Sequence, residues 1–399
     1  MGIVVQKYGG SSLGTNARVR RVAAKVAERH REGDQVVVVV SARGETTDNL
    51  MDMATSLGGD PPQREMDVLL SAGEQISRSL LALAIDSLGR EVISLSGPQA
   101  GILTDDQHLK AEILRVKPER ILEELEQGRI VVVAGFQGQG PHGEMTTLGR
   151  GGSDTTAVAL AAALEADRCE IYSDVAGVWS TDPRKVPDAR PVPHIAYGEM
   201  YELARQGAGV LHYRAVSLAE ETGVEIAARS TFDGNAETRI CSSGPSSVAG
   251  VAYRPRVLWV RGESRTLSLG QELFSPVPPE ELVTIEAAAG SGRPASDVLV
   301  PLENVPEEEA FVTRIEQGLG DAVELRDDCG TVTAVGRDLH TSTKVGALHR
   351  HLRAQGLVVH QELNSRNSHT WVLPRLQIED ALRQVHRWLL KEPSWELAG

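Results

Sequence analysis

"TTLGRGGSDTTAVALAAALEAD", residues 146–167, places one arginine among three glycines and continues through Ser153 and Asp154 into an almost wholly apolar stretch. Glycines remove side chains where a ligand must approach the backbone. A helix that begins here would offer free backbone N–H groups and the positive end of its dipole. The stretch therefore predicts a cradle for an anion at the start of a buried helix near 155–166.

Short β-branched runs alternate with helical patterns from residue 3 to about residue 230. The runs are nearly all apolar, which is typical of strands buried on both faces of a parallel sheet. We expect a three-layer αβα domain with ligands bound beyond the carboxyl ends of its strands. The expected strands are IVVQ from residue 3, 35–41, 129–136 and 169–174, and the expected helices are 17–31, 66–88 and 155–166.

The pattern changes near residue 240, where "CSSGPSSVAG" (241–250) indicates a linker. Two weaker units follow it, and each resembles a small βαββα module. The predicted organisation is a main domain over 1–240, a divergent module over 250–330 and a second module over 331–395.

Length and composition limit the class of protein. A chain of 399 residues is too long for one core, and its net charge of −14 argues against a general nucleic-acid or membrane binder. No apolar run has the length of a membrane span, the first residues lack a signal-peptide pattern, and the three cysteines lack metal spacing. We therefore expect a cytoplasmic protein.

A second glycine-rich loop, "KYGGSS", begins with Lys7 at the carboxyl end of the first expected strand. Backbone amides and hydroxyls around Gly9, Gly10 and Ser11 would hold phosphate oxygens, and Lys7 would neutralise a transferring phosphoryl group. The alternative is a tight strand–helix turn with a surface lysine. The pattern G-x-x-x-x-G-K-[ST] is absent, which excludes a Walker-type nucleotide site.

Other motifs carry weaker signals. "GQGPHG" (138–143) fits a dinucleotide-binding pattern, but the proline and the residues after it indicate a hairpin. Glu74 is an acidic residue within an apolar helix and needs a cation or hydrogen-bond donors when buried. Thr47 in the loop "SARGETTDN" and Arg184 in "YSDVAGVWSTDPR" are ligand candidates, although both segments also fit ordinary loops.

Together, "VVQKYGGSSL", "VVVVVSARGETTDNL", "EMDVLLSAGEQIS", "IVVVAGFQG", "TTLGRGGSDTTAVALAAALEAD" and "CEIYSDVAGVWSTDPRKVPDAR" closely resemble aspartate kinase, of the amino-acid kinase fold, over about residues 1–232. The resemblance implies transfer of the ATP γ-phosphoryl group to the β-carboxylate of L-aspartate, with Mg²⁺ carried by the nucleotide and no metal cage of the protein. It also implies two C-terminal ACT-like modules and a homodimer or larger homo-oligomer formed through them.

The resemblance also implies roles for individual residues. Lys7 and Asp154 would be catalytic, Asp154 orienting Lys7. Arg150 would grip a substrate carboxylate, and Glu74 would meet the substrate ammonium. The full substrate set is Thr47, Glu74, Arg150, Gly151, Gly152 and Ser153, and the nucleotide set is Gly9, Gly10, Ser11, Ser41, Ser173, Asp174, Trp179, Asp182 and Arg184.

Two departures from the family matter. Gly209 stands where the family has a lysine that contacts ATP phosphates, and Tyr213 replaces a proline. In the first module "RGESRTLSLGQELF" replaces a D-x-P-G turn, and "AAAGSG" replaces an effector-binding "QN" stretch. We therefore expect little or no feedback inhibition by lysine or threonine, which is compatible with a specialised pathway.

Two alternatives remain open at this level. One is a kinase for a related amino-acid carboxylate, which Thr47, Glu74 and Arg150 argue against. The other is a catalytically dead homologue that only binds ATP or an amino acid. Gly209 favours that alternative, whereas Lys7 and Asp154 oppose it.

Overall fold

The computed structural model describes residues 2–59, 61–232, 236–244, 248–263, 266–267, 270–275, 277–286, 295–303, 305, 307–337, 339, 343–365 and 367–390. By their contacts these fall into two compact units. The first comprises 1–178, 191–201 and 209–244, and the second comprises 179–190, 202–208 and the chain from 245 onward. Two segments inside 1–240 therefore group with the second unit rather than with the first.

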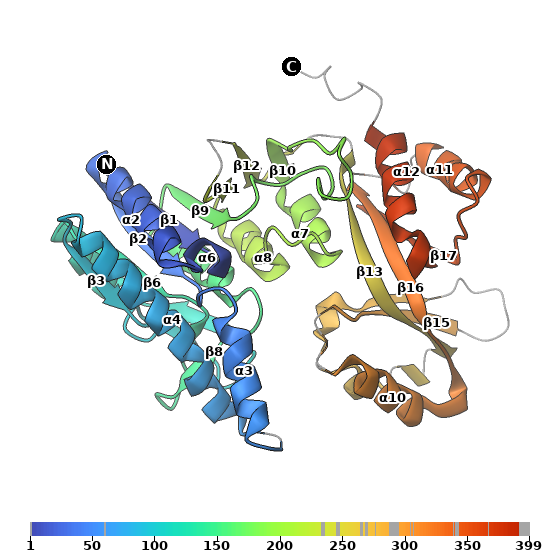
Figure 1. Ribbon diagram of the computed structural model, residues 1–399, viewed down its shortest axis with the longest axis horizontal. Coiled ribbons are helices and arrows are strands. Elements are labelled where there is room, and N and C mark those ends of the chain that lie inside the picture. The colour runs from blue at the N-terminus through green and yellow to red at the C-terminus, as the bar shows by residue number, and fades with distance from the viewer. Residues whose placement is uncertain are drawn as a thin grey trace. The chain divides into compact units, whose positions relative to one another are not determined.

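An eight-stranded, mainly parallel sheet forms the centre of the first unit (Figure 1). Its strands are long apolar runs such as "QVVVVV", in which the five valines are fully buried. Antiparallel pairing occurs only between β11 and β12 within this sheet. The strand order is β10 (His194–Ala196), β12 (Glu237–Cys241), β11 (Ile226–Ser230), β9 (Arg168–Ser173), β1 (Ile3–Tyr8), β2 (Gln35–Val40), β6 (Ile130–Ala134) and β3 (Val92–Leu95).

Helices cover both faces of this sheet, as expected for three layers. Even-numbered side chains of β1 and β2, such as Tyr8 and Val38, pack with α2 and α4. Val39 points the other way, toward Ser153 at the start of α6. The helices of this unit are α1 (Gly10–Leu13), α2 (Asn16–Arg31), α3 (Thr46–Ser56), α4 (Gln63–Asp86), α5 (Glu119–Glu126), α6 (Gly152–Ala163), α7 (Tyr197–Arg205, whose last residues join the second unit) and α8 (Tyr213–Thr222).

A small sheet of four strands lies beside the carboxyl end of β6. It contains β5 (Ile113–Val116), β4 (Ile102–Thr104), β7 (Gln137–Gln139) and β8 (Met145–Thr147). β7 and β8 pair antiparallel, and the Gly140 N–H donates to the Glu144 carbonyl at 2.9 Å. The hairpin expected around "GQGPHG" is thereby confirmed.

The second unit is built on one six-stranded sheet. Its two central strands are unusually long, so both expected modules share them. The order is β14 (Val283–Glu286), β15 (Ala295–Pro301), β13 (Val248–Glu263), β16 (Val323–Gly336), β18 (Ser368–Pro374) and β17 (Gln361–Asn364), with α10 (Glu308–Leu319), α11 (Thr343–Ala354) and α12 (Ile378–Leu390).

Two apolar clusters pack this sheet against its helices, one with α10 and one with α11 and α12. The expected linker over 241–250 is wrong for its last residues, because β13 already begins at Val248. The "AAAGSG" stretch lies outside the described residues.

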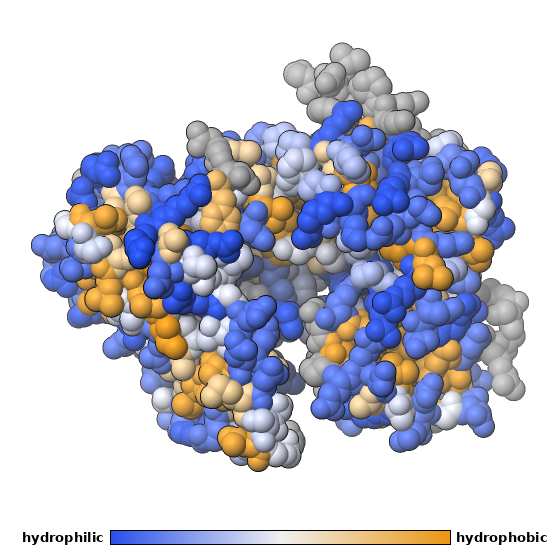
Figure 2. Space-filling view, viewed as in Figure 1, coloured by the Kyte–Doolittle hydropathy of each residue, from blue (hydrophilic) through white to orange (hydrophobic). Residues whose placement is uncertain are grey.

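Helix α4 is long and apolar enough to cross a membrane by length and composition alone, a test that core helices of soluble proteins also pass. Its inner face packs on β3, β6 and β8. Its outer face exposes Val68, Ile76 and Leu83, and hydrophobic surface lies along this helix in Figure 2.

Candidate active site

The carboxyl ends of β1, β2, β6 and β9 meet at one edge of the central sheet. Tyr8 pairs with Val40 on one side and with Tyr172 on the other, and Val40 pairs with Ala134. The residues that follow these strands therefore lie side by side, as expected for parallel neighbours. This edge carries Lys7, the Gly9–Gly10 loop, Ser41 and Ser173.

Lys7 and Asp154 form an ion pair at this edge. The Lys7 ammonium lies 2.6 Å from Asp154 Oδ1, and the two side chains are only 13% and 10% exposed. Residues 147 places apart in the chain are joined because α6 packs across β1. A shielded ammonium held by one carboxylate is suited to stabilising a phosphoryl group in transfer.

The glycines around Arg150 have a measurable steric role. Gly149 and Gly151 have φ of 72° and 73°, a region that favours glycine. A Cβ at Gly151 would lie 2.0 Å from Cγ of His212, and one at Gly152 would lie 2.8 Å from Cβ of Leu148. The loop therefore cannot accept side chains at these positions, and it presents Arg150 as an exposed residue.

His212 was not identified from the sequence, although it shapes the same loop. Its backbone N–H donates to Asp154 Oδ2 at 3.3 Å, and its Nδ1 caps α8 by accepting from the Arg214 N–H at 3.4 Å. Burial lowers the pKa of His212 to about 4, so its ring is neutral near pH 7. No sequence pattern indicated His212, because its role depends on its contact with Gly151, 61 residues away in the chain.

The Gly9–Gly10 loop is held between β9 and the residues after β2. The Gly9 N–H donates to the Tyr172 carbonyl at 3.2 Å, and the Gly44 N–H donates to the Gly10 carbonyl at 3.0 Å. A Cβ at Gly10 would lie 2.6 Å from the Ala42 carbonyl oxygen, so this approach requires glycine. Ser11 follows in α1, and Ser41 begins the loop after β2.

Glu74 reaches the same loop from α4. Its Oε1 accepts from the Ala42 N–H at 2.8 Å, whereas its Oε2 is buried and has no partner among the described residues. Burial raises the pKa of Glu74 to about 7. A half-satisfied buried carboxylate is costly unless a donor or cation completes it, which fits a ligand ammonium.

Asp67, seven residues before Glu74 on the same helix face, is a second buried carboxylate that the sequence analysis missed. It is fully buried and accepts from Leu109 N at 3.0 Å, Thr147 Oγ1 at 2.5 Å and the His108 ring at 2.6 Å. These bonds fix the chain just before the Gly149–Gly152 loop. The sequence did contain a signal for Asp67: it lies two helical turns before Glu74, so both carboxylates fall on the same face of one apolar helix.

The remaining candidates in the first unit lie nearby. Thr47 was expected in a loop, but it lies in the first turn of α3, because Thr46 and the residues after it continue as a helix. Ser173 Oγ hydrogen-bonds within its own turn, to Val175. Asp174 is exposed.

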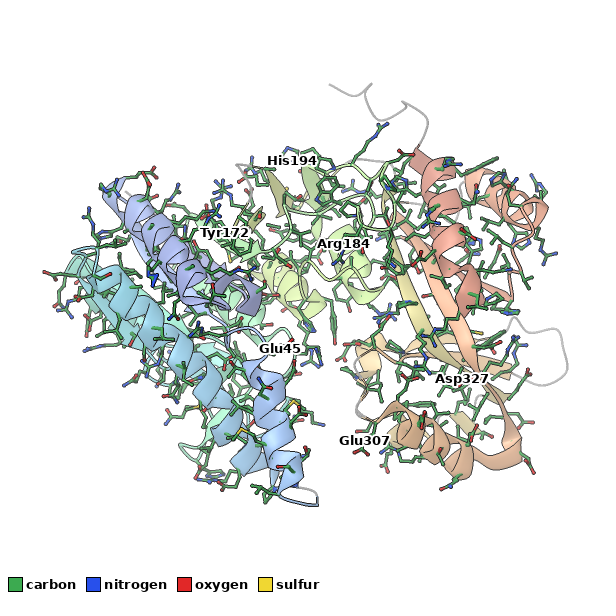
Figure 3. The ribbon with its side chains drawn as sticks, viewed as in Figure 1. Glu45, Tyr172, Arg184, His194, Glu307 and Asp327 are labelled. Carbon is green, nitrogen blue, oxygen red and sulfur yellow. The ribbon has the colours of Figure 1, made fainter. Side chains whose placement is uncertain are left out.

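Trp179, Asp182 and Arg184 belong to the second unit. Asp182 accepts two hydrogen bonds from the Arg184 guanidinium at 2.9 and 3.0 Å, one from the Arg184 backbone N–H at 2.9 Å and one from the Tyr253 hydroxyl at 3.3 Å. The Arg184 side chain, labelled in Figure 3, is 86% exposed. Their assignment to a nucleotide site stays a prediction.

Gly209 is exposed, and a Cβ there would meet nothing within 4 Å. Arg205 and Arg214 are the arginines nearest to Gly209 in the sequence and are therefore the candidates to replace the charge of a lysine at this position. Arg205 instead donates to the Glu280 and Leu282 carbonyls of the second unit, at 2.5 and 3.1 Å.

One edge of the central sheet thus carries a shielded ammonium paired with a carboxylate, two glycine-rich loops and a buried carboxylate with one oxygen that has no described partner. The amino acid kinase family model matches residues 2–228, more than half of the chain. The aspartokinase of Bacillus sp. (strain MGA3) is 39% identical over 100% of this chain and 98% of its own length. That of Geobacillus stearothermophilus is 39% identical over 97% of each chain.

The solved structure of E. coli aspartokinase III in complex with aspartate and ADP covers 98% of this chain and 100% of its own, with a TM-score of 0.80. At 22% identity this likeness shows the fold. The chain is thus a member of the amino acid kinase family, and within that family it belongs to the aspartokinases.

Proposed function

We propose that the protein transfers the γ-phosphoryl group of ATP to the β-carboxylate of L-aspartate and releases aspartyl phosphate and ADP. The observation that carries this proposal is the convergence, at one sheet edge, of the Lys7–Asp154 pair and the half-satisfied carboxylate of Glu74. The first suits a phosphoryl group and the second suits an ammonium. Both relatives named above are aspartokinases, which points the same way.

In this mechanism the acceptor is already a nucleophile. A carboxylate carries no proton at pH 7, so the reaction needs no general base. The catalytic work is positioning and neutralisation of charge on the transferring group. Lys7 would meet the γ-phosphoryl oxygens, and Asp154 would hold the Lys7 ammonium in place.

Substrate orientation would rest on two charges. Glu74 Oε2 would accept from the substrate ammonium, which completes the hydrogen bonding of a buried oxygen. Arg150, exposed at the glycine loop, would grip a substrate carboxylate with two parallel hydrogen bonds. Thr47 and Ser153 would contribute hydroxyls at the same loop ends.

The nucleotide would lie along Gly9, Gly10, Ser11, Ser41, Ser173 and Asp174, with Trp179, Asp182 and Arg184 as further candidates. Mg²⁺ would enter with ATP and neutralise phosphate charge. Among the described residues no three His, Cys, Asp or Glu side chains form a group that would hold a metal ion.

The second unit would pair with its counterpart in a homo-oligomer, and feedback inhibition by lysine or threonine would be weak or absent. We also infer a cytoplasmic enzyme.

An ADP-release assay with ATP, Mg²⁺ and a panel of acidic amino acids tests the proposal. Turnover with L-aspartate above all other acceptors is the expected result. Faster turnover with a substituted aspartate would favour the kinase for a related carboxylate. ATP binding without ADP release from any acceptor would favour the inactive homologue.

A further inference from the structure

Helix α4 carries two buried carboxylates on one face, and only Glu74 has a part in the proposed reaction. Asp67 lies seven residues before Glu74, which is about 10 Å along the helix axis. Asp67 is fully buried, and both of its oxygens accept hydrogen bonds. The donors come from two segments outside α4, so Asp67 joins this helix to other parts of the first unit.

The first of these segments is the turn that contains His108 and Leu109. Asp67 Oδ2 lies 2.6 Å from Nδ1 of His108, and Asp67 Oδ1 accepts from the Leu109 N–H at 3.0 Å. A carboxylate supplies only acceptors, so Nδ1 carries the proton that joins the two side chains. Leu109 has φ of 66°, a backbone conformation that a leucine keeps only where its surroundings hold it.

The second segment is β8, together with the glycine loop that follows it. The Thr147 hydroxyl donates to Asp67 Oδ1 at 2.5 Å, two residues before this loop begins. The Leu109 carbonyl oxygen also lies close to the loop, because a Cβ at Gly149 would come within 3.0 Å of it. The loop that presents Arg150 therefore rests on the turn that Asp67 holds.

The far end of the loop is held by contacts of its own. The Phe136 N–H donates to Thr156 Oγ1 at 3.1 Å, and the Thr156 hydroxyl donates to the Gly152 carbonyl at 2.8 Å. These contacts lie at the start of α6, next to Asp154, and neither involves the turn at Leu109. A change in that turn should therefore displace the first half of the loop and leave the second half in place.

We propose that Asp67 and His108 are positioning residues that tie the loop of Arg150 to helix α4. Glu74 lies on the same helix, so this tie sets the separation of the two charges that hold the substrate. The inference rests on the proposed function, in which Glu74 and Arg150 bind the two ends of aspartate. A ligand with a fixed distance between its ammonium and its carboxylates binds well only when the groups that hold it match that distance.

Steady-state ADP release by the full-length protein with ATP, Mg²⁺ and L-aspartate tests the proposal. His108→Ala removes one contact of Asp67, and Asp67→Ala removes all three. His108→Asn is the conservative variant, because an asparagine amide nitrogen can donate to Asp67 from about the place of Nδ1. His142→Ala, at an exposed histidine in the turn between β7 and β8, is the matched control.

His108→Ala should raise the KM for aspartate about tenfold and Asp67→Ala up to about a hundredfold, the loss that a displacement of about 1 Å can cause. The kcat and the KM for ATP should stay within about threefold of the unsubstituted values, because the Lys7–Asp154 end of the loop keeps its contacts. His108→Asn should restore the KM for aspartate, and His142→Ala should not change it.

A purely structural role would lower the melting temperature and the fraction of active enzyme, with the KM for aspartate unchanged, and that result would overturn the proposal. An equal rise in the KM for ATP would overturn it as well. If Asp67→Ala does not fold, as judged by circular dichroism, the two His108 variants decide.

Hydrogen exchange of the amides of residues 146–151 in the ligand-free protein tests the tie without turnover. Exchange should be about tenfold faster in His108→Ala than in the unsubstituted protein and in His108→Asn, because loosened segments open more often. Unchanged exchange would overturn the inference whatever the assay shows. Absence of ADP release by the unsubstituted protein would instead contradict the proposed function, while exchange still decides whether the tie exists.

Discussion

Glu74 in the first unit and Glu362 in the second are both carboxylates partly or wholly withdrawn from water, yet their pKa values move in opposite directions. Burial raises the pKa of Glu74 to about 7. Burial also acts on Glu362, but the nearby His369 ring and the hydrogen bond from His349 outweigh it, so the pKa of Glu362 falls below its usual value.

The difference lies in what each carboxylate contacts. Glu362 on β17 accepts from His349, lies 3.7 Å from the His369 ring and accepts from the Trp371 indole at 3.0 Å. Glu74 has one backbone donor and a buried oxygen without a described partner. A buried carboxylate whose oxygens accept hydrogen bonds, such as Glu362, stabilises the folded protein. A buried carboxylate with an oxygen that lacks a donor, such as Glu74, indicates that a bound ligand supplies the donor.

The largest expected effect is at Lys7. Lys7→Ala should lower kcat at least a hundredfold, because loss of one preorganised charge costs about 3–4 kcal/mol in the transition state. Folding should survive, since Lys7 lies at a strand end beside a loop, and circular dichroism checks this. Steady-state ADP release gives kcat, and near-normal turnover would remove Lys7 from the mechanism.

Glu74→Gln should raise the KM for aspartate by about tenfold to a hundredfold, as expected when a charged hydrogen bond is lost, with a smaller change in the KM for ATP. Arg150→Ala should act in the same direction.

In the unsubstituted enzyme the KM for aspartate should rise as pH falls below about 7, because Glu74 becomes protonated. A weakened ATP affinity with unchanged aspartate binding would show that Glu74 and Arg150 contact the nucleotide and not the aspartate.

Glu74→Gln should also change the stability of the ligand-free protein. Because its folded pKa is raised, the stability that Glu74 contributes is present below its unfolded pKa and lost as pH rises through about 7. Glu74→Gln should therefore raise the melting temperature of the ligand-free protein at pH 8 and change it little at pH 5. A lower melting temperature at pH 8 would contradict an unsatisfied carboxylate.

Glu362→Gln should behave in the opposite way. Loss of a carboxylate that accepts from several donors should cost about 1–3 kcal/mol of unfolding free energy. Because the folded pKa of Glu362 is lowered, this cost is present above its unfolded pKa and disappears as pH falls through the folded value. Denaturant unfolding at pH 7 and pH 4 measures it, and a large change in kcat with intact stability would place Glu362 in the reaction instead.

Gly209→Lys should give a smaller effect, about threefold to tenfold tighter ATP binding, through one added charge near the phosphates. The exposed backbone position leaves space for the side chain. Nucleotide titration measures the change, with Gly209→Gln as the uncharged control. Unchanged affinity would mean that the loop no longer faces the nucleotide.

The smallest expected effect is inhibition by lysine and threonine. Millimolar concentrations of either, alone or together, should change the rate less than twofold, and solution scattering should report an oligomer. Strong inhibition would mean that an effector site survives in the second unit. A monomer would contradict the proposed pairing of that unit.

Sequence patterns predicted the alternating elements of the first unit closely, because buried parallel strands are continuous apolar runs. The run "QVVVVVS" was expected over 35–41, and the strand is Gln35–Val40. The prediction was less accurate where local composition is ambiguous. "SARGETTDN" was taken for a loop, but its last four residues form the start of α3, and the linker region already contains the first residues of β13.

By itself the sequence determined the αβα class and the two glycine-rich loops with Lys7 and Asp154. These depend on local spacing and on side-chain chemistry, which a chain carries without folding. Only the tertiary structure decided that Lys7 and Asp154 pair at 2.6 Å, that His212 occupies the space beside Gly151, and that Asp67 accepts from Leu109 and Thr147. Each of these contacts joins residues from different elements, and its distance is set by how the helices pack on the sheet.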